Sequence, residues 1–395
     1  MSLSQEAMTH IDYVVDVDTE IAPFLQRWAM LVNERSLPFH ALPWLNAWYA
    51  TLGNTPDCTP LLVTVRRLDT GADVMLLPLT SHRQGGLSVV GFADATVMDY
   101  TSPLVAPDWA GGTGNRPTDM VCAERLWKAL RHALRAHDVL RIDKMLDQPL
   151  DENLQGGNPL LLVLRPRLHP CEMFGNQFHT GDDWDAWNHT LDKRIRKEFA
   201  RCWRVFTRSE SARFERVTEP QAALALFEEL ERQQMQRMTQ LDYDYVLDQP
   251  AYRAFYRQAL ADGLIDGSVV LTALRDGKAV VAVQFGLASR HRYIALRLSM
   301  GGDEWKACSP GRLLCEHTAQ HLHAQGLRWF DFGIGDYRHK QAFGVSHIAL
   351  LDGCEALSWR GWPMTWAWRL RRALKHQRWL VSMVRRLKNK SSLQT

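Results

Sequence analysis

The stretch VVLTALRDGKAVVAVQFGLA, residues 269–288, decides the fold class of this chain. Two apolar runs flank Asp276-Gly277, a preferred pair for a tight hairpin turn. A third strand, a loop, a helix that ends at Gly326 and a last strand follow it. This order predicts a mixed α/β (α+β) fold around a mostly antiparallel sheet flanked by helices. The predicted strands are 269–274, 280–288, 293–300 and 327–332, and the predicted helix is 309–325.

The first half of the chain repeats the same order of elements. Its predicted strands are 61–66, 72–79, 87–92 and 139–143, with a helix at 120–137. The last strand of each half also carries a bulky apolar residue followed by an aspartate, as Ile142-Asp143 and Phe330-Asp331. We therefore expect a duplicated fold, and 395 residues are enough for two domains.

Helical spacing predicts linking helices between the two halves. The first presents Leu191, Phe199 and other apolar residues on one face and a series of lysines and arginines on the others. Thr218 and Gln221 predict a capping box for the second, and a third helix is expected from Pro250 to about Leu260.

Composition and motif counts exclude several classes of protein. Seven cysteines are widely spaced without a Cys-x-x-Cys pair, which argues against a disulfide framework and against a zinc site, so we expect no metal. Residues 1–20 lack lysine, arginine and an apolar core, and no run reaches the roughly 18 apolar residues of a membrane span. The sequence therefore predicts a cytoplasmic protein.

Charge is concentrated at the C-terminal end. Residues 356–395 contain ten lysines and arginines and no acidic residue, so they carry +10, while the whole chain carries +3 and the first 355 residues −7. Trp366, Leu370 and Leu374 begin an apolar stripe along a basic amphipathic helix. Such a helix can dock on the acidic body and bury its stripe, or bind the inner face of an anionic membrane. An RNA backbone would also fit the charge, but no nucleic-acid motif accompanies it.

The stretch ACSPGRLL, residues 307–314, predicts a helix start suited to an anion. Ser309 is a favoured N-cap, and Pro310 fits the first helical position. Gly311 lets a ligand approach the backbone, and Arg312 adds positive charge. Free amides and the helix dipole at such an end bind phosphate. The alternative is that the motif only begins a helix.

The stretch FDFGIGDYRHKQAFG, residues 330–344, places titratable groups directly after a strand. Asp331, Asp336 and His339 are candidates to accept a proton from an ammonium group. Lys340 is a candidate to neutralise a donor phosphate or a substrate carboxylate. The alternative is a solvated connecting loop whose glycines only turn the chain.

The region from Trp184 through Ser346 resembles the CelD/BcsL-type acetyltransferases, a FemAB-like branch of the GNAT superfamily. The resemblance rests on LDKRIRKE at 191–198, SPGRLL at 309–314 and DFGIGD at 331–336 with Lys340 and Phe343-Gly344. Residues 39–44 and 77–79 look like the degenerate partner domain of these proteins. The resemblance implies tandem GNAT-like domains, at 1–175 and 176–355, with a basic tail at 356–395.

That resemblance implies transfer of an acyl group from a thioester, with acetyl-CoA or another acyl-CoA as co-substrate, to a small-molecule amine acceptor. A splayed strand would contact the thioester and a helix start would hold the donor phosphates. The catalytic candidates remain Asp331, Asp336, His339 and Lys340. Donor-binding roles fall on Leu298, Met300, Ser309, Gly311, Arg312 and Leu313.

The acceptor expected from the family is an amino sugar or amino-acid derivative in exopolysaccharide, cellulose or envelope synthesis. Two alternatives stay open: transfer from aminoacyl-tRNA, as in FemAB-like peptidyl transferases, and a non-catalytic scaffold at a membrane polysaccharide synthase. The chain lacks the Gly-x-Gly/Ala donor loop of orthodox GNAT enzymes, and it has His339 where relatives carry tyrosine.

Overall fold

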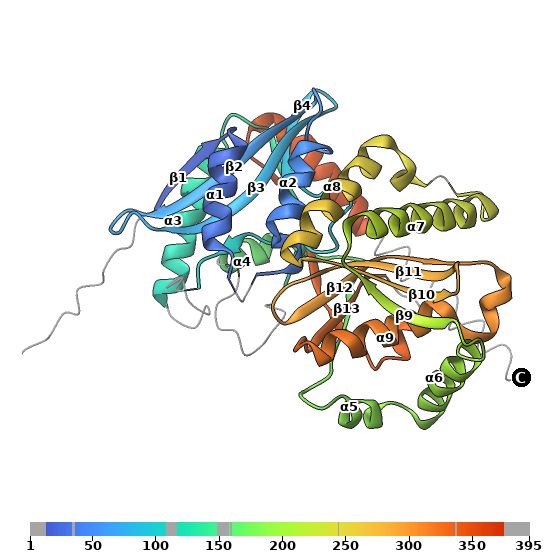
Figure 1. Ribbon diagram of the computed structural model, residues 1–395. Helices are drawn as coiled ribbons and strands as arrows, with labels where there is room; N and C mark the ends of the chain where they lie inside the picture. The colour runs from blue at the N-terminus through green and yellow to red at the C-terminus, as the bar shows by residue number, and fades with distance from the viewer. Residues whose placement is uncertain are drawn as a thin grey trace, which may run out of the picture.

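Two β-sheets lie next to each other, each with helices against its faces (Figure 1). The computed structural model describes residues 13–33, 36–107, 117–147, 158, 160–243, 245–335 and 338–374, and the side chains of residues 117–119, 338 and 339 fall outside that description.

The first sheet has the strand order β1-β2-β3-β4-β6-β15-β7, with β5 paired to β3. Helices α1 and α2 cover one face and α3 and α4 the other, because residues such as Leu61 and Leu62 alternate between two separate cores. The strands are β1 (Tyr13–Asp18), β2 (Cys58–Arg67), β3 (Asp73–Gln84), β4 (Leu87–Phe92), β5 (Leu104–Val105), β6 (Val139–Leu146), β7 (His169–Pro170) and β15 (Leu350–Ala356). The helices are α1 (Ile21–Leu31), α2 (Leu42–Ala50), α3 (Pro117–Ala133) and α4 (Leu160–Leu164).

The second sheet has the strand order β14-β8-β13-β12-β11-β10-β9. Helices α7 and α8 cover the face toward the first sheet, and α5, α6 and α9 cover the other. The strands are β8 (Gly175–His179), β9 (Ala212–Val217), β10 (Val269–Asp276), β11 (Ala279–Ala288), β12 (Arg292–Met300), β13 (Trp329–Ile334) and β14 (Ser346–Ile348). The helices are α5 (Trp184–Thr190), α6 (Lys193–Phe206), α7 (Pro220–Gln240), α8 (Pro250–Asp266), α9 (Pro310–Ala324) and α10 (Arg338–Gln341).

The expected duplication is confirmed by the topology. In the first half β2, β3 and β4 are antiparallel, and the chain returns through α3 to β6, which pairs parallel to β4. In the second half β10, β11 and β12 are antiparallel, and the return through α9 places β13 parallel to β12. The crossing helix is what permits a parallel pair in each otherwise antiparallel sheet. The predicted mixed α/β tandem fold is therefore present.

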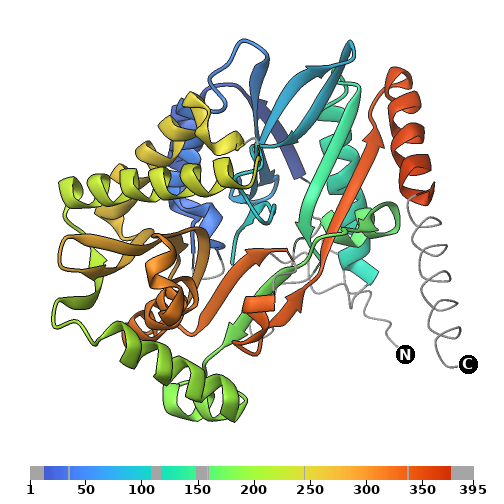
Figure 2. The same cartoon turned by 90° about the vertical axis from the view of Figure 1, so that its right-hand side faces the viewer.

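The chain exchanges strands between the two sheets. β8 comes directly after the first half and pairs with β13 in the second sheet. β15 comes after the second half and pairs with β6 in the first sheet. Figure 2 shows β15 running beside the first-sheet strands at the edge of the molecule. The boundary expected at residue 175 falls at the start of β8, where the chain passes to the second sheet, whereas the boundary expected at 355 falls inside β15, a strand of the first sheet.

Two predicted helix starts differ in their capping. Ser309 stands at the N-cap of α9 with φ +49°, and its hydroxyl makes no capping hydrogen bond. The positive φ turns the side chain away from the first-turn amides. Helix α7 begins at Pro220, and the carboxylate of Glu219 accepts from the amides of Gln221 and Ala222. The predicted Thr218–Gln221 capping box is therefore wrong, because Glu219 already satisfies those donors.

Aromatic side chains join the two halves into a common core. Trp44 of α2 lies 4.6 Å from Phe255 and 5.8 Å from Tyr256 of α8, measured between ring centroids. Phe39 lies 6.1 Å from Tyr100 in an edge-to-face arrangement. The seam between the sheets is therefore packed like a protein interior and positions Tyr100 next to the second sheet. Among the helices of the described ranges, none has the length and apolar character to cross a membrane.

Candidate functional site

Strands β12 and β13 separate at Asp331. Their parallel pairing covers three residue pairs and ends at Ile294 and Asp331, although β12 continues to Met300. The pairing of β13 with β8 shifts register between Asp331 and Ile334, where Gly333 has φ +68°. We call the region beyond Ile294 and Asp331 the fork. Backbone polar groups that lose their strand partner there are available to a ligand.

A β-bulge lies on β12 immediately inside the fork. Phe285 of β11 pairs with Arg297 and Gly286 with Ala295, which leaves Leu296 as an extra residue. A Cβ on Gly286 would lie 2.3 Å from the carbonyl oxygen of Ile294, so glycine is required for this close approach. The bulge reorients the Leu296 backbone. It is located upstream of the stretch 298–301, where the sequence led us to expect backbone contacts to a thioester.

Asp331 is the buried carboxyl at the base of the fork, with 1% of its surface exposed. Its Oδ1 accepts hydrogen bonds from the Tyr100 hydroxyl at 2.9 Å and from the Gly333 amide at 2.7 Å. Its Oδ2 has no hydrogen-bond partner among the described residues, and Nη1 of Arg292 lies 4.0 Å away. Burial raises the pKa of Asp331 to about 6, against the lowering effects of Arg292, the Gly333 amide and Tyr100.

Asp99 brings a second buried carboxyl to the fork from the first half of the chain. Burial raises the pKa of Asp99 to about 7, and repulsion from Asp331 adds to the rise. A Cβ on Gly333 would lie 2.0 Å from Oδ2 of Asp99, so the carboxyl is pressed against the backbone of β13. Neither Asp99 nor Tyr100 is among the candidates from the sequence, because only the tertiary fold brings them to Asp331.

Lys340 and Asn176 fix the turn that follows Asp331. The Lys340 ammonium is buried and donates to the carbonyls of Gly333 at 3.2 Å, Ile334 at 2.8 Å and Gly335 at 3.4 Å. The Asn176 amide donates to the carbonyls of Gly333 at 3.0 Å and Gly335 at 2.8 Å. Lys340 thus contacts backbone carbonyls, which differs from the donor phosphate or substrate carboxylate expected from the sequence.

The other two catalytic candidates lie outside the described side chains. Asp336 follows Gly335 directly in the chain, and His339 belongs to α10, whose backbone is described. Their roles stay predictions.

The start of α9 is packed against the fork strand β12. A Cβ on Gly311 would lie 2.8 Å from Sδ of Met300 and 3.2 Å from Cδ2 of Leu298. Gly311 and Leu313 are buried, and Leu313 donates its amide to the Ser309 carbonyl at 3.1 Å. The structure therefore brings the predicted donor-binding residues of β12 and α9 together, with Gly311 as the contact that permits the close approach.

A charged cluster joins α6 to the start of α9. Glu198 accepts hydrogen bonds from Arg312 at 3.1 Å and from Arg201 at 2.8 Å. Hydrogen bonding from Arg201 lowers the pKa of Glu198 to about 2. Arg201 also donates to the Ala307 carbonyl at 3.3 Å, in the turn that leads into α9. Part of the positive charge expected from Arg312 is therefore balanced within the protein.

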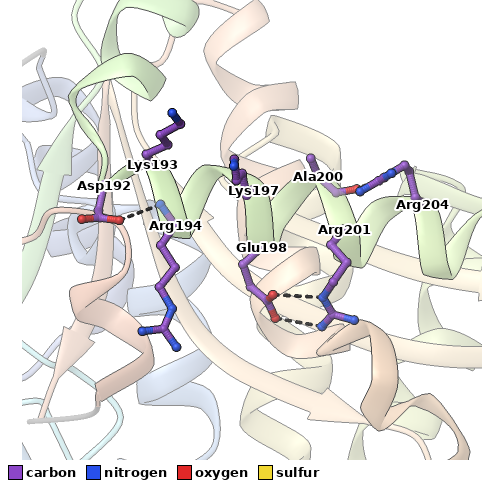
Figure 3. A pocket seen from close by; sticks show the side chains of 8 residues that line it. All are labelled: Asp192, Lys193, Arg194, Lys197, Glu198, Ala200, Arg201 and Arg204. Atoms are coloured by element: carbon purple, nitrogen blue, oxygen red, sulfur yellow. Dashed lines mark hydrogen bonds and ion pairs between the residues drawn. The ribbon is translucent and has the colours of Figure 1, made fainter.

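A cavity of about 920 Å³ follows α6 beside this cluster (Figure 3). In Figure 3 Lys193 and Lys197 project from one side of α6, while Arg194 and Arg201 project from the opposite side. The residues that line the cavity include five cations and two carboxylates, so the surface along α6 is positively charged. We call the cavity the α6 groove, and it is lined by Asp192, Lys193, Arg194, Lys197, Glu198, Ala200, Arg201 and Arg204.

Two further cavities, of about 350 and 370 Å³, lie where β10 begins and β11 ends. They share Asp266, Ser268 and Arg290 in their walls. Asp331 lines none of these three cavities formed by described residues. Across those same residues, no group of three histidine, cysteine, aspartate or glutamate side chains is arranged to hold a metal ion.

Comparison with known proteins agrees with this geometry. Residues 193–341 match the family model described as "Acetyltransferase (GNAT) domain". The crystal structure of FemX superposes with a TM-score of 0.57 at 11% identity, covering 87% of this chain and 98% of FemX. A C-terminal domain described as that of a lysylphosphatidylglycerol synthetase from Agrobacterium fabrum superposes with a TM-score of 0.50 at 12% identity, covering 85% and 92%. No curated protein sequence matches the chain significantly.

The architecture is thus a tandem GNAT-like fold of the acyltransferase type. The matched segment contains α6, the fork, α9 and Lys340, so the part of the chain similar to GNAT acetyltransferases is the part that holds the candidate site.

Proposed function

We propose that this protein is an N-acyltransferase that moves an acyl group from a thioester to a primary amine, with its chemistry at the fork. The observation that carries the proposal is the placement of a buried carboxyl, Asp331, where β12 and β13 part, next to the bulge at Leu296. The start of α9 is packed on the same strand at Met300.

Acyl-CoA is the donor that these residues fit. When bound, it supplies an activated thioester together with phosphate groups. The close contact of Gly311 with Met300 brings the helix start to the strand that would face the thioester, and amides at a helix start bind phosphate. Lys193, Lys197 and the other cations of the α6 groove lie on the helix bonded to that start, and they provide positive charge for further phosphates.

The side chains of the fork supply proton transfer and orientation. A primary amine enters as an ammonium ion and loses one proton to a carboxylate before its nitrogen attacks the thioester carbon. The nitrogen loses a second proton as the C–S bond breaks; one of the two protons ends on the leaving thiolate and the other is released to solvent. Oδ2 of Asp331 accepts no hydrogen bond from the described residues, and with a pKa of about 6 the carboxyl is ionised at neutral pH. In this proposal the amide of the bulged Leu296 donates to the carbonyl oxygen on which charge develops.

Asp336 is the second candidate for the proton acceptor. Because Asp331 is 1% exposed, either the fork opens when substrates bind or the proton goes to Asp336 or to His339, the third candidate from the sequence. The two aspartates are separated by Asp331→Asn and Asp336→Asn. The variant that removes the proton acceptor lowers kcat and removes the acidic limb of the pH profile. A variant that only loses a positioning contact lowers kcat and keeps that limb.

The acceptor we propose is an amino sugar or an amino-acid derivative of exopolysaccharide or envelope synthesis, on the strength of the family resemblance. Transfer from aminoacyl-tRNA is the rival reaction, and phosphates of RNA would also fit the α6 groove.

The test is release of free thiol from acetyl-CoA and longer acyl-CoA donors in the presence of amino sugars and amino acids. Turnover that is lost in Asp331→Asn or Asp336→Asn supports the proposal. Turnover only with charged tRNA, abolished by ribonuclease, would identify the rival reaction. No turnover with any of these donors, together with full function in cells of both aspartate variants, would identify a non-catalytic scaffold.

A further inference from the structure

The last described helix, residues 362–374, is docked on the first sheet over β4, β6 and β15. Arg369 pairs with Glu355 at 3.0 Å and Arg372 pairs with Asp352 at 3.0 Å, both on β15. The ring of Trp368 lies 5.5 Å from that of His169 between centroids, in a tilted arrangement, and packs with Met364 against a small core of the sheet. These contacts on one side of the helix fix which side faces outward.

The outward side of this helix carries large apolar residues. They are spaced three, four, four and four residues apart and are between 50% and 81% exposed. Figure 2 shows the helix at the edge of the molecule beside β15, with the rest of the fold on its other side. We call these residues the tryptophan stripe: Trp359, Trp362, Trp366, Leu370 and Leu374.

This arrangement decides between two interpretations of the sequence. A docked helix was expected to bury the stripe of Trp366, Leu370 and Leu374 against the acidic body. The helix is docked, but through Trp368, Arg369 and Arg372, which leaves the stripe exposed. Single exposed apolar residues are ordinary, whereas a continuous apolar stripe marks an interaction surface.

The charge around the stripe selects the partner. Residues 356–395 contain ten lysines and arginines and no acidic residue. A second copy of the chain that met this surface stripe to stripe would bring two such segments together and their charges would repel. Tryptophan rings prefer the headgroup level of a bilayer, and neighbouring cations bind anionic lipid phosphates. A basic helix with a tryptophan-rich apolar side therefore matches an anionic lipid surface.

We infer that the tryptophan stripe, together with the exposed Arg371 and the positive charge of residues 356–395, docks this protein on the surface of an anionic lipid bilayer. The helix lies in the plane of the interface, and its opposite side stays attached to β15. This inference is independent of the reaction at the fork, because no residue of the stripe belongs to the candidate site.

The test is co-sedimentation of the full-length protein with phosphatidylcholine vesicles with and without phosphatidylglycerol. The triple variant Trp362→Ser, Trp366→Ser, Leu370→Ser removes the centre of the stripe at exposed positions, so its thermal unfolding stays close to that of the parent chain. The parent chain pellets with the anionic vesicles, and the triple variant loses at least about tenfold in binding. A matched control, Met30→Ser with Ile265→Ser, changes two apolar residues that are 78% and 84% exposed elsewhere and leaves binding unchanged.

Arg371→Glu tests the electrostatic part at an exposed cation of the same helix, and it reduces the preference for phosphatidylglycerol. Two outcomes overturn the inference. One is equal vesicle binding by the parent chain and the triple variant. The other is a dimer of the parent chain that becomes a monomer in the triple variant, with no vesicle binding by either, which would make the stripe a contact between two copies.

Discussion

The hydroxyl of Tyr100 donates a 2.9 Å hydrogen bond to Oδ1 of Asp331 across 231 residues of sequence. Both groups are buried, and the bond joins the two GNAT-like halves at the base of the fork. A hydrogen bond to a buried carboxylate contributes more than one between neutral groups. The first half of the chain therefore contributes a side chain to the candidate site.

Replacement of Tyr100 by phenylalanine removes this bond while keeping the ring. The hydrogen bond lowers the pKa of Asp331, so its loss raises that pKa and moves the acidic limb of kcat/KM to higher pH. Stability falls by about 1.5–3 kcal/mol. Tyr49→Phe is the control, since it removes another buried hydroxyl, which is bonded to the Leu79 carbonyl at 3.3 Å within the first half. An acidic limb that stays in place in Tyr100→Phe would exclude Asp331 as the titrating group.

Asp99 makes the stability of the protein depend on pH in an unusual direction. Its folded pKa of about 7 lies above the ordinary value of 3.8, so the folded state binds more protons than the unfolded state between these values. The contribution of protonated Asp99 to the free energy of unfolding is then fully present below about pH 4 and is lost as the pH rises through about 7. Asp99→Asn removes this loss. In denaturant unfolding, the free energy of unfolding of the variant minus that of the parent chain therefore increases by at least about 1 kcal/mol from pH 4.5 to pH 8.

The control for that experiment is Asp303→Asn, at a surface carboxylate paired with Lys306. This variant differs from the parent chain by the same amount at both pH values. A constant difference for Asp99→Asn as well would mean that Asp99 is ionised throughout this range.

The sequence was sufficient for the features that depend on near neighbours. The hairpin 269–288 was predictable because its strands are adjacent in the chain, and Gly277 adopts the expected positive φ of +56°. Helix α9 was predictable from its periodicity and from Gly326, which has φ +100° just after its end. The duplicated order of elements followed from the same local signals.

The features that depend on distant contacts were not predictable in this way. The pairing of β15 with β6 joins residues more than 200 positions apart, and nothing in the run 350–356 distinguishes the first sheet from the second. The contact of Tyr100 with Asp331 has the same origin. Lys340 is a candidate because a lysine after a glycine-rich turn can bind phosphate; in the fold its ammonium donates to the carbonyls of 333–335, and its role toward a donor stays a prediction.

Gly333 is a position where both φ and space require glycine. An alanine there would have φ +68° and a Cβ 2.0 Å from Oδ2 of Asp99. Gly71→Ala is the matched control, since Gly71 has φ +69° and nothing within 4 Å of the added Cβ. Thermal unfolding shows a loss of about 1 kcal/mol for Gly71→Ala from the backbone alone, and at least about twice that for Gly333→Ala, with loss of activity. Equal losses in the two variants would mean that Asp99 moves aside freely.

Lys193 and Lys197 test the assignment of the α6 groove to the donor. Both are exposed and project from the same side of α6 (Figure 3), so Lys193→Glu with Lys197→Glu reverses two charges and leaves the packed side of the helix intact. If donor phosphates bind there, KM for acyl-CoA rises by about tenfold or more, kcat changes little, and the effect shrinks at high salt. Lys278→Glu, at an exposed hairpin turn of the same sheet, is the control and leaves KM unchanged. A donor without the 3′-phosphate shows how much of the effect comes from that phosphate, because the rise in KM caused by the double variant is then smaller than with intact acyl-CoA. An unchanged KM for both donors in the double variant would remove the groove from the donor site and leave it for the acceptor.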